Sequence, residues 1–183
     1  VLEKEIIPNL IDNGKRPLKV WSSACSTGEE PYSLVMLLTK FYNLNEIKVL
    51  ASDIDDGAMD KAKVGVYSEK SLANLPFEFK QQYFEQVGNS FRIKDKIKNR
   101  VEFKKLDLLK DPFPQNIDLV TCRNVMIYFT DEAKELLYSK FHSSLSQEGV
   151  FFVGSTEQII VPERYNFKSI KTFFYKKLSS LSK

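Results

Sequence analysis

Residues 22–33 read SSACSTGEEPYS, and this stretch decides the fold class. The apolar run LKVW precedes it and the apolar run LVMLL follows it. Small residues with one glycine between two apolar runs predict a strand, a tight turn and the start of a helix. Thr27 and Glu30 have the spacing of a capping box, and Pro31 suits the first helical turn, where a missing N–H is tolerated.

The same alternation continues along the chain. We expect strands at residues 18–22, 48–54, 101–108, 117–122 and 150–154, with one or two more within 167–176, and helices at 1–12, 29–42, 59–64 and 131–145, the last followed by Gly149. Strands that alternate with helices predict an α/β fold with a mostly parallel sheet, covered on both faces. Ligands of such folds bind beyond the carboxyl ends of the strands.

Residues 65–99 interrupt this alternation. They are rich in Lys, Glu and Gln, and Gly88 with Asn89 forms a turn signal between two short apolar runs, which predicts a β-hairpin. We therefore expect a small inserted antiparallel β-subdomain at 65–99 within one catalytic domain that spans residues 1–183.

Composition narrows the class of protein. The 183 residues carry a net charge of +3, too weak to indicate nucleic acid binding. No apolar run approaches the roughly 18 residues of a membrane span, so we expect no membrane insertion. Cys25 and Cys122 are too few for a disulfide framework, which favours a cytoplasmic protein with free thiols. His142 is expected on the surface, and no metal site is expected.

The quoted turn does not suit a phosphate. Of the glycines in a dinucleotide-binding turn only Gly28 is present, and Glu29 and Glu30 would repel a phosphate. The two acids have a structural interpretation at even odds, since carboxylates stabilise a helix N-terminus. The functional interpretation is a cationic ligand, and S-adenosylmethionine (SAM) carries a sulfonium and an ammonium but no phosphate.

Polar residues follow three other strands. Asp53 is placed to accept the two ribose hydroxyls of an adenosine; the alternative, a cap of the next helix, suits Asp55 and Asp56 better. Asp107 and Leu108 could bracket an adenine, although a polar strand end is nearly as good an explanation. Residues 122–129 read CRNVMIYF, in which we expect Arg123 and Asn124 to be buried with partners. Tyr128 either lines the site or is a core aromatic.

At this point the motifs match a family. Residues 22–33, residues 52–55 (SDID), residues 65–68 (GVYS) and residues 122–129 resemble, in the same order, those of the chemotaxis-receptor glutamate methyltransferases, the CheR family. The resemblance runs from about Val1 to Tyr175. It implies a class I SAM-dependent methyltransferase with a Rossmann-like sheet, SAM as cofactor and S-adenosylhomocysteine (SAH) as product.

The resemblance also implies roles for individual residues. Tyr128 would stand near the transferred methyl group and Arg123 in the cofactor cleft, and both are our candidates for the catalytic residues. The cofactor-binding candidates are Ala24, Ser26, Thr27, Gly28, Glu29 (methionine part), Asp53 (ribose), Asp107 and Leu108 (adenine), Arg123 and Asn124. The chain departs from the family where Ala24 replaces a common Gly, where Asp107 replaces an Asn, and where residues 154–157 read GSTE instead of GHSE.

The resemblance implies a protein-glutamate O-methyltransferase that acts on the cytoplasmic helices of chemotaxis receptors, as a cytoplasmic monomer. Lys94, Lys96 and Lys98 could attract these acidic helices. The family's helical N-terminal domain and its N-x-T-x-F-F-R segment are not found in this sequence, so we expect weak cofactor binding. Two alternatives stay open: a class I methyltransferase of nucleic acid, although Asn124 is not followed by Pro-Pro-Tyr, and a non-catalytic receptor adapter.

Overall fold

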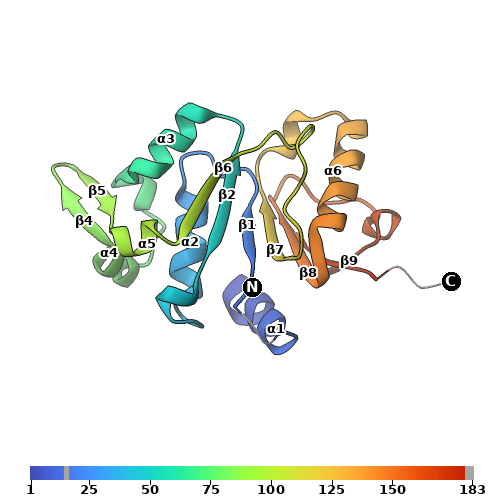
Figure 1. The fold of residues 1–183 in the computed structure, drawn as a ribbon, viewed down its shortest axis with the longest axis horizontal. Coiled ribbons are helices and arrows are strands. Elements are labelled where there is room, and N and C mark those ends of the chain that lie inside the picture. The colour runs from blue at the N-terminus through green and yellow to red at the C-terminus, as the bar shows by residue number, and fades with distance from the viewer. Residues whose placement is uncertain (15–16, 180–183) are drawn as a thin grey trace. The chain divides into compact units, whose positions relative to one another are not determined.

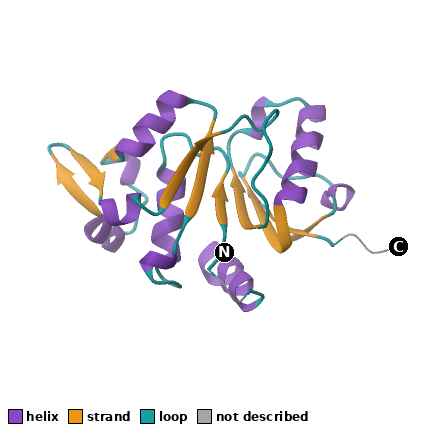
Figure 2. Ribbon diagram, viewed as in Figure 1, coloured by secondary structure: helices purple, strands orange, loops and turns teal. Residues whose placement is uncertain are grey.

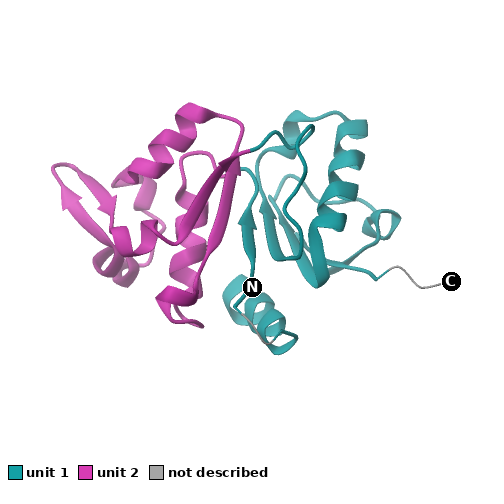
Figure 3. Cartoon of the chain, viewed as in Figure 1, with its two compact units in different colours: residues 1–24, 106–183 teal, residues 25–105 magenta. Residues whose placement is uncertain are grey.

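The computed structural model describes residues 1–14 and 17–179, and Figure 1 labels their helices and strands. The chain divides into two compact units, coloured separately in Figure 3. Unit 1 comprises Val1–Ala24 and Leu106–Lys183, and unit 2 comprises Cys25–Lys105.

Unit 1 contains three parallel strands and a C-terminal antiparallel hairpin. Its strand order is β1-β7-β8-β10-β9; β1 runs parallel to β7 and β7 to β8, whereas β10 is antiparallel to both of its neighbours. Its elements are η1 (Leu2–Ile6), α1 (Ile7–Asp12), β1 (Val20–Ser22), β7 (Ile117–Cys122), η4 (Met126–Tyr128), α6 (Asp131–Ser144), β8 (Leu145–Val153), η5 (Pro162–Tyr165), β9 (Phe167–Lys171) and β10 (Phe174–Lys177).

Aromatic side chains fill the core of unit 1. The rings of Phe141 in α6 and Phe151 in β8 stack with centroids 4.6 Å apart, and Trp21 in β1 meets Phe113 edge-on at 4.9 Å. All residues of β7 are buried, because a parallel strand is covered on both faces. Its one charged residue, Asp118, is buried with hydrogen-bond partners: it accepts the Lys19 N–H and the Ser146 hydroxyl.

Unit 2 combines a parallel strand pair with a separate antiparallel sheet, as Figure 2 shows. Helices α2 and α3 both pack on the parallel pair β2–β6, and the antiparallel sheet has the order β3-β5-β4. Its elements are α2 (Glu29–Leu38), η2 (Leu44–Glu46), β2 (Val49–Asp53), α3 (Asp56–Val64), β3 (Val66–Ser68), η3 (Lys70–Leu72), α4 (Phe77–Tyr83), β4 (Phe84–Val87), β5 (Ser90–Ile93), α5 (Asp95–Lys98) and β6 (Val101–Lys105).

The fold class expected from the sequence is confirmed. The pairs β2–β6, β1–β7 and β7–β8 are parallel, and the small antiparallel sheet is present. The predicted hairpin is β4–β5, and Gly88 in its turn has φ 60°, a left-handed conformation that glycine adopts without strain.

Three local predictions were wrong. The N-cap of α2 is Gly28 rather than Thr27, so no capping box forms. Gly149 lies inside β8 instead of ending a helix; a Cβ there would approach Ile117 O to 2.8 Å, so glycine permits the irregular register of β7 with β8. His142 is half-buried: its Nε2 lies 3.2 Å from Leu178 O, and burial lowers its pKa.

Candidate active site

The turn before α2 is tight and requires glycine. Gly28 has φ 92°, and a Cβ on it would lie 2.8 Å from Ala62 Cβ and 2.9 Å from the Tyr67 hydroxyl. The Thr27 hydroxyl donates to Glu29 Oε2 over 2.6 Å, which orients this exposed carboxylate at the first residue of α2. The turn can therefore bring its backbone close to a ligand, with the Glu29 carboxylate beside it.

Asp53 joins this turn to the end of β2. Its Oδ2 accepts the Ser26 N–H over 2.8 Å and its Oδ1 accepts the Asp55 N–H over 3.0 Å. Each carboxylate oxygen has a second lone pair, so the half-buried side chain can still accept two hydroxyls. Asp55 caps α3 by accepting the Ala58 N–H, as expected, which leaves Asp53 free of that task.

Two buried tyrosines support the turn from below, a feature that the sequence did not single out. The Tyr67 hydroxyl, from β3, donates to Thr27 O, and the Tyr32 hydroxyl, from α2, donates to Ala62 O, each over 2.7 Å. Burial raises the pKa of both phenols, so they stay neutral donors. The β3 strand of the antiparallel sheet thus fixes the turn directly.

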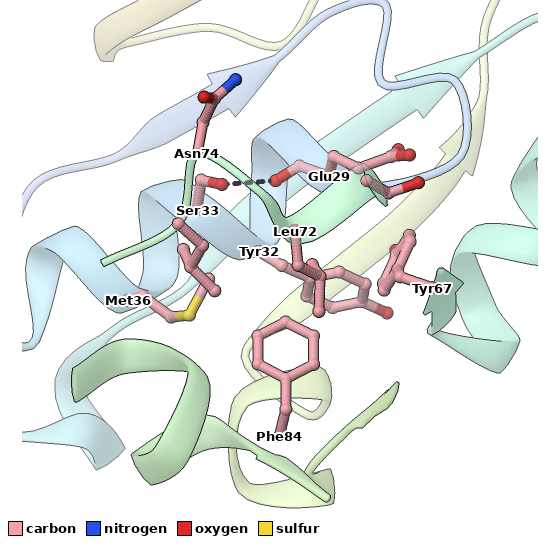
Figure 4. A pocket seen from close by; sticks show the side chains of 10 residues that line it. Glu29, Tyr32, Ser33, Met36, Tyr67, Leu72, Asn74 and Phe84 are labelled. Carbon is pink, nitrogen blue, oxygen red and sulfur yellow. Dashed lines mark hydrogen bonds between the residues drawn. The ribbon is translucent and has the colours of Figure 1, made fainter. Parts of the chain in front are cut away.

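A cavity of about 160 Å³ lies beside Glu29, and Figure 4 shows its lining. It is lined by Glu29, Tyr32, Ser33, Met36, Tyr67, Ser71, Leu72, Asn74, Leu75 and Phe84. Sites for drug-sized ligands usually enclose about 300–1,000 Å³. This cavity is therefore too small for a whole adenosyl cofactor. Of its lining residues, Glu29 is the one that also belongs to the turn before α2.

Cys25 precedes the turn, and its thiol is unreactive. Its side chain is 3% exposed, and burial, together with the charge of Asp53, raises its pKa to about 12. Cys25 and Cys122 are both buried, and neither belongs to a disulfide. A protonated thiol is a poor nucleophile, so Cys25 packs against its neighbours instead of reacting.

The loop after β7 carries the second group of candidates, and here one expectation was wrong. Arg123 and Asn124 are exposed rather than buried, and the Arg123 guanidinium lies 5.2 Å from the centre of the Phe152 ring. Tyr128, in η4, is 79% exposed, which rules out the core alternative. All three side chains are thus accessible from solvent.

Glu157 holds this loop, a role that sequence reasoning missed, although the residue lies in the GSTE stretch at 154–157. It is 6% exposed, and its carboxylate accepts backbone N–H groups from Asn124, Val125, Met126 and Gly154 at 2.6–3.0 Å. A signal for such a residue would be an acid just beyond a buried apolar strand.

The remaining candidates lie elsewhere in unit 1. β6 ends at Lys105, so Asp107 and Leu108 belong to the following loop and not to the strand. Asp107 accepts a hydrogen bond from the Leu109 N–H, which lowers the pKa of its carboxyl group. Leu108 is buried, and its carbonyl oxygen accepts a hydrogen bond from Lys140 Nζ. Ala24 is half-buried just after β1.

The donors and acceptors present suit a cationic nucleoside better than a nucleotide. Residues 22–33 contain two acids and neither Lys nor Arg, and the glycine turn lets backbone approach a ligand closely. Asp53 retains acceptor capacity for a diol. Within residues 1–14 and 17–179, no three side chains of His, Cys, Asp or Glu are grouped to hold a metal ion.

Comparison with known proteins gives a family. The family model described as CheR methyltransferase, SAM binding domain, matches residues 1–175. The chemotaxis protein methyltransferase of Listeria monocytogenes is 38% identical over 174 residues, covering 95% of this chain and 66% of that protein. The corresponding protein of Borreliella burgdorferi is 36% identical and is covered over 60% of its length. The chain thus spans about two thirds of these relatives.

Solved structures agree on the fold. A TehB-like SAM-dependent methyltransferase from Corynebacterium glutamicum superposes with a TM-score of 0.53 at 16% identity, over 92% of this chain and 83% of that one. In the part of the chain that the structure describes, no helix combines the length and apolar character of a membrane span.

Proposed function

The chain belongs to the CheR methyltransferase SAM-binding domain family, and from this premise we propose that it is the catalytic domain of a protein-glutamate O-methyltransferase that acts on chemotaxis receptors. Relatives bearing the name chemotaxis protein methyltransferase cover most of the chain at 36–38% identity. The observation that carries the proposal is the Gly28 turn joined to Asp53, within the region that the family model matches.

The cofactor is SAM, which supplies an electrophilic methyl group on a sulfonium when bound. We assign Glu29 to its ammonium, because this exposed carboxylate is oriented by Thr27, and Asp53 to its ribose hydroxyls. Gly28, with Ser26 and Thr27, lets the backbone approach the ligand. In unit 1, Asp107, Leu108 and Ala24 keep the adenine and backbone roles that the family resemblance implies.

The reaction needs no general base in this chain. A glutamate side chain has a pKa of roughly 4.3 and is already an anion at pH 7. The protein's task is to exclude water and to align the carboxylate oxygen with the methyl carbon. Exposed Arg123 can pair with the incoming carboxylate, Asn124 with the cofactor, and exposed Tyr128 can flank the methyl group.

We assign receptor contact to the inserted subdomain at 65–99. Of its lysines, Lys98 pairs with Asp95 and Lys94 donates to Gln82 O, while Lys96 lies over the Tyr83 ring. The first two thus have local partners, which weakens their proposed attraction for acidic receptor helices. The partner is a receptor's cytoplasmic helix bundle, and the enzyme acts as a cytoplasmic monomer.

The test is a methyl-transfer assay with radiolabelled SAM and receptor-enriched membranes. A glutamyl methyl ester is cleaved by mild alkali and releases volatile methanol, so the expected label is alkali-labile and migrates with the receptor. Label in added nucleic acid would instead make the chain a nucleic acid methyltransferase. No transfer, with no SAH binding by calorimetry, would leave a receptor adapter.

A further inference from the structure

We propose that Glu157 is a positioning residue that fixes the loop after β7, and through it the placement of Arg123, Asn124 and Tyr128. What these three residues do rests on the proposed function. The fixing of the loop rests on contacts within unit 1 alone.

A single buried carboxylate gathers the backbone of two segments. Its Oε2 accepts the N–H groups of Asn124 over 2.6 Å and of Gly154 over 3.0 Å. Its Oε1 accepts those of Val125 over 2.8 Å and of Met126 over 2.6 Å. Each carboxylate oxygen offers two lone pairs, so these four bonds use its capacity fully. Successive N–H groups that converge in this way form an anion-binding concavity, here filled by a side chain of the same unit.

Gly154 is part of the same arrangement. A Cβ at this position would overlap Glu157 Oε2 and would lie 3.1 Å from both Asn124 N and Asn124 Oδ1. Asn124 itself has φ 59°, a left-handed conformation that asparagine tolerates better than most residues. The close approach of the two segments therefore depends on a glycine on one side and on the carboxylate that bridges them.

Beyond these hydrogen bonds, burial anchors the two ends of the η4 segment to different degrees. Met126 is 1% exposed and holds the loop by burial, whereas Tyr128 is 79% exposed and has little packing to orient it. The Tyr128 N–H reaches back to Val125 O over 3.2 Å, so its placement follows that of a residue held by Glu157. Loss of the carboxylate would release the loop without opening the aromatic core.

Two variants test this from different residues. Glu157→Gln keeps the shape but replaces one acceptor oxygen by NH2, so two of the four N–H groups face a donor. Gly154→Ala pushes the intact carboxylate out of place. Glu163→Gln, at an exposed position of η5, is the matched control. The readouts are amide hydrogen exchange and amide proton chemical shifts in the ligand-free chain, and SAH affinity by calorimetry.

We expect both variants to speed exchange at residues 124–126 at least tenfold, since a hydrogen bond to a charged acceptor contributes about that factor or more. The amide proton shifts of these residues should change together, while exchange at Leu119 and Val120 in β7 should match the wild type. SAH affinity should fall at least tenfold, and Glu163→Gln should change none of these.

Unchanged exchange at residues 124–126 would overturn the proposal, and so would an equal increase throughout β7, which would indicate a general loss of stability. Faster loop exchange with unchanged SAH affinity would also overturn it. If the wild-type chain does not bind SAH, the proposed function fails, and the exchange measurement still decides whether Glu157 fixes the loop.

Discussion

Replacing Asp53 tests the assignment of the ribose. Asp53→Asn preserves the size of the side chain but leaves one oxygen, so the Ser26 N–H and the Asp55 N–H can no longer both be satisfied. Asp53→Ala removes both bonds. Asp60→Asn is the matched control, because Asp60 lies on α3 and its exposed carboxylate pairs with exposed Lys63.

Replacing Asp53 should affect the stability of the chain less than its affinity for SAH. Both N–H groups lie at exposed positions, where water can replace the lost acceptor, so we expect unfolding free energy to fall by only about 1 kcal/mol. A ribose hydroxyl on a carboxylate makes a charge-assisted bond of about 1.5–3 kcal/mol. Loss of even one such bond corresponds to about a tenfold or greater loss of affinity.

The assay combines two measurements on each variant. Calorimetric titration with SAH gives the affinity, and urea unfolding gives the stability. We expect a tenfold or greater loss of SAH affinity in both Asp53 variants, larger for Ala than for Asn, and none in Asp60→Asn. A folded Asp53→Ala variant with wild-type SAH affinity would refute the reasoning and move the ribose elsewhere.

Three further outcomes can be measured. Tyr67→Phe removes the donor to Thr27 O and should lower the unfolding free energy by about 0.5–1.5 kcal/mol in urea; no change would mean that the Thr27 carbonyl finds another partner. Burial raises the pKa of Cys25 to about 12, so on raising the pH the thiol of the unfolded chain ionises before that of the native chain. The unfolding free energy should therefore fall as pH rises from about 9 towards 12. Urea unfolding at several pH values should show a flatter slope for Cys25→Ala, and an equal slope would contradict this role of Cys25. The β4–β5 turn at residues 88–89 is short and offers little loop to grip a peptide, so we expect this subdomain to dock on the receptor region that is methylated. An isolated receptor C-terminal peptide should then not bind with micromolar affinity, and such binding by calorimetry would contradict this.

Local sequence determined much of the fold. The bounds of β7 match the predicted strand at 117–122, because its mainly apolar residues are all buried and the polar loop residues Arg123 and Asn124 follow directly. The β4–β5 hairpin follows from Gly88, whose left-handed φ only certain residues accept. The turn before α2 follows from its small residues and Gly28, because a tight turn leaves no room for larger side chains.

Tertiary structure decided the rest. Gly149 follows a helical pattern in sequence, yet it lies in β8, where the Ile117 carbonyl comes too close to leave room for a Cβ. The exposure of Arg123 and Tyr128 depends on which neighbours cover them, and no local pattern reports that. Glu157 accepts hydrogen bonds from N–H groups more than 30 residues away in sequence, and an acid at this position does not by itself predict that those groups lie beside it. The sequence alone determined which residues can form strands, turns and ligand contacts, because those preferences are local; only the folded chain decided which carboxylate faces a ligand and which one holds a loop, because hydrogen-bond partners and burial are set by distant segments.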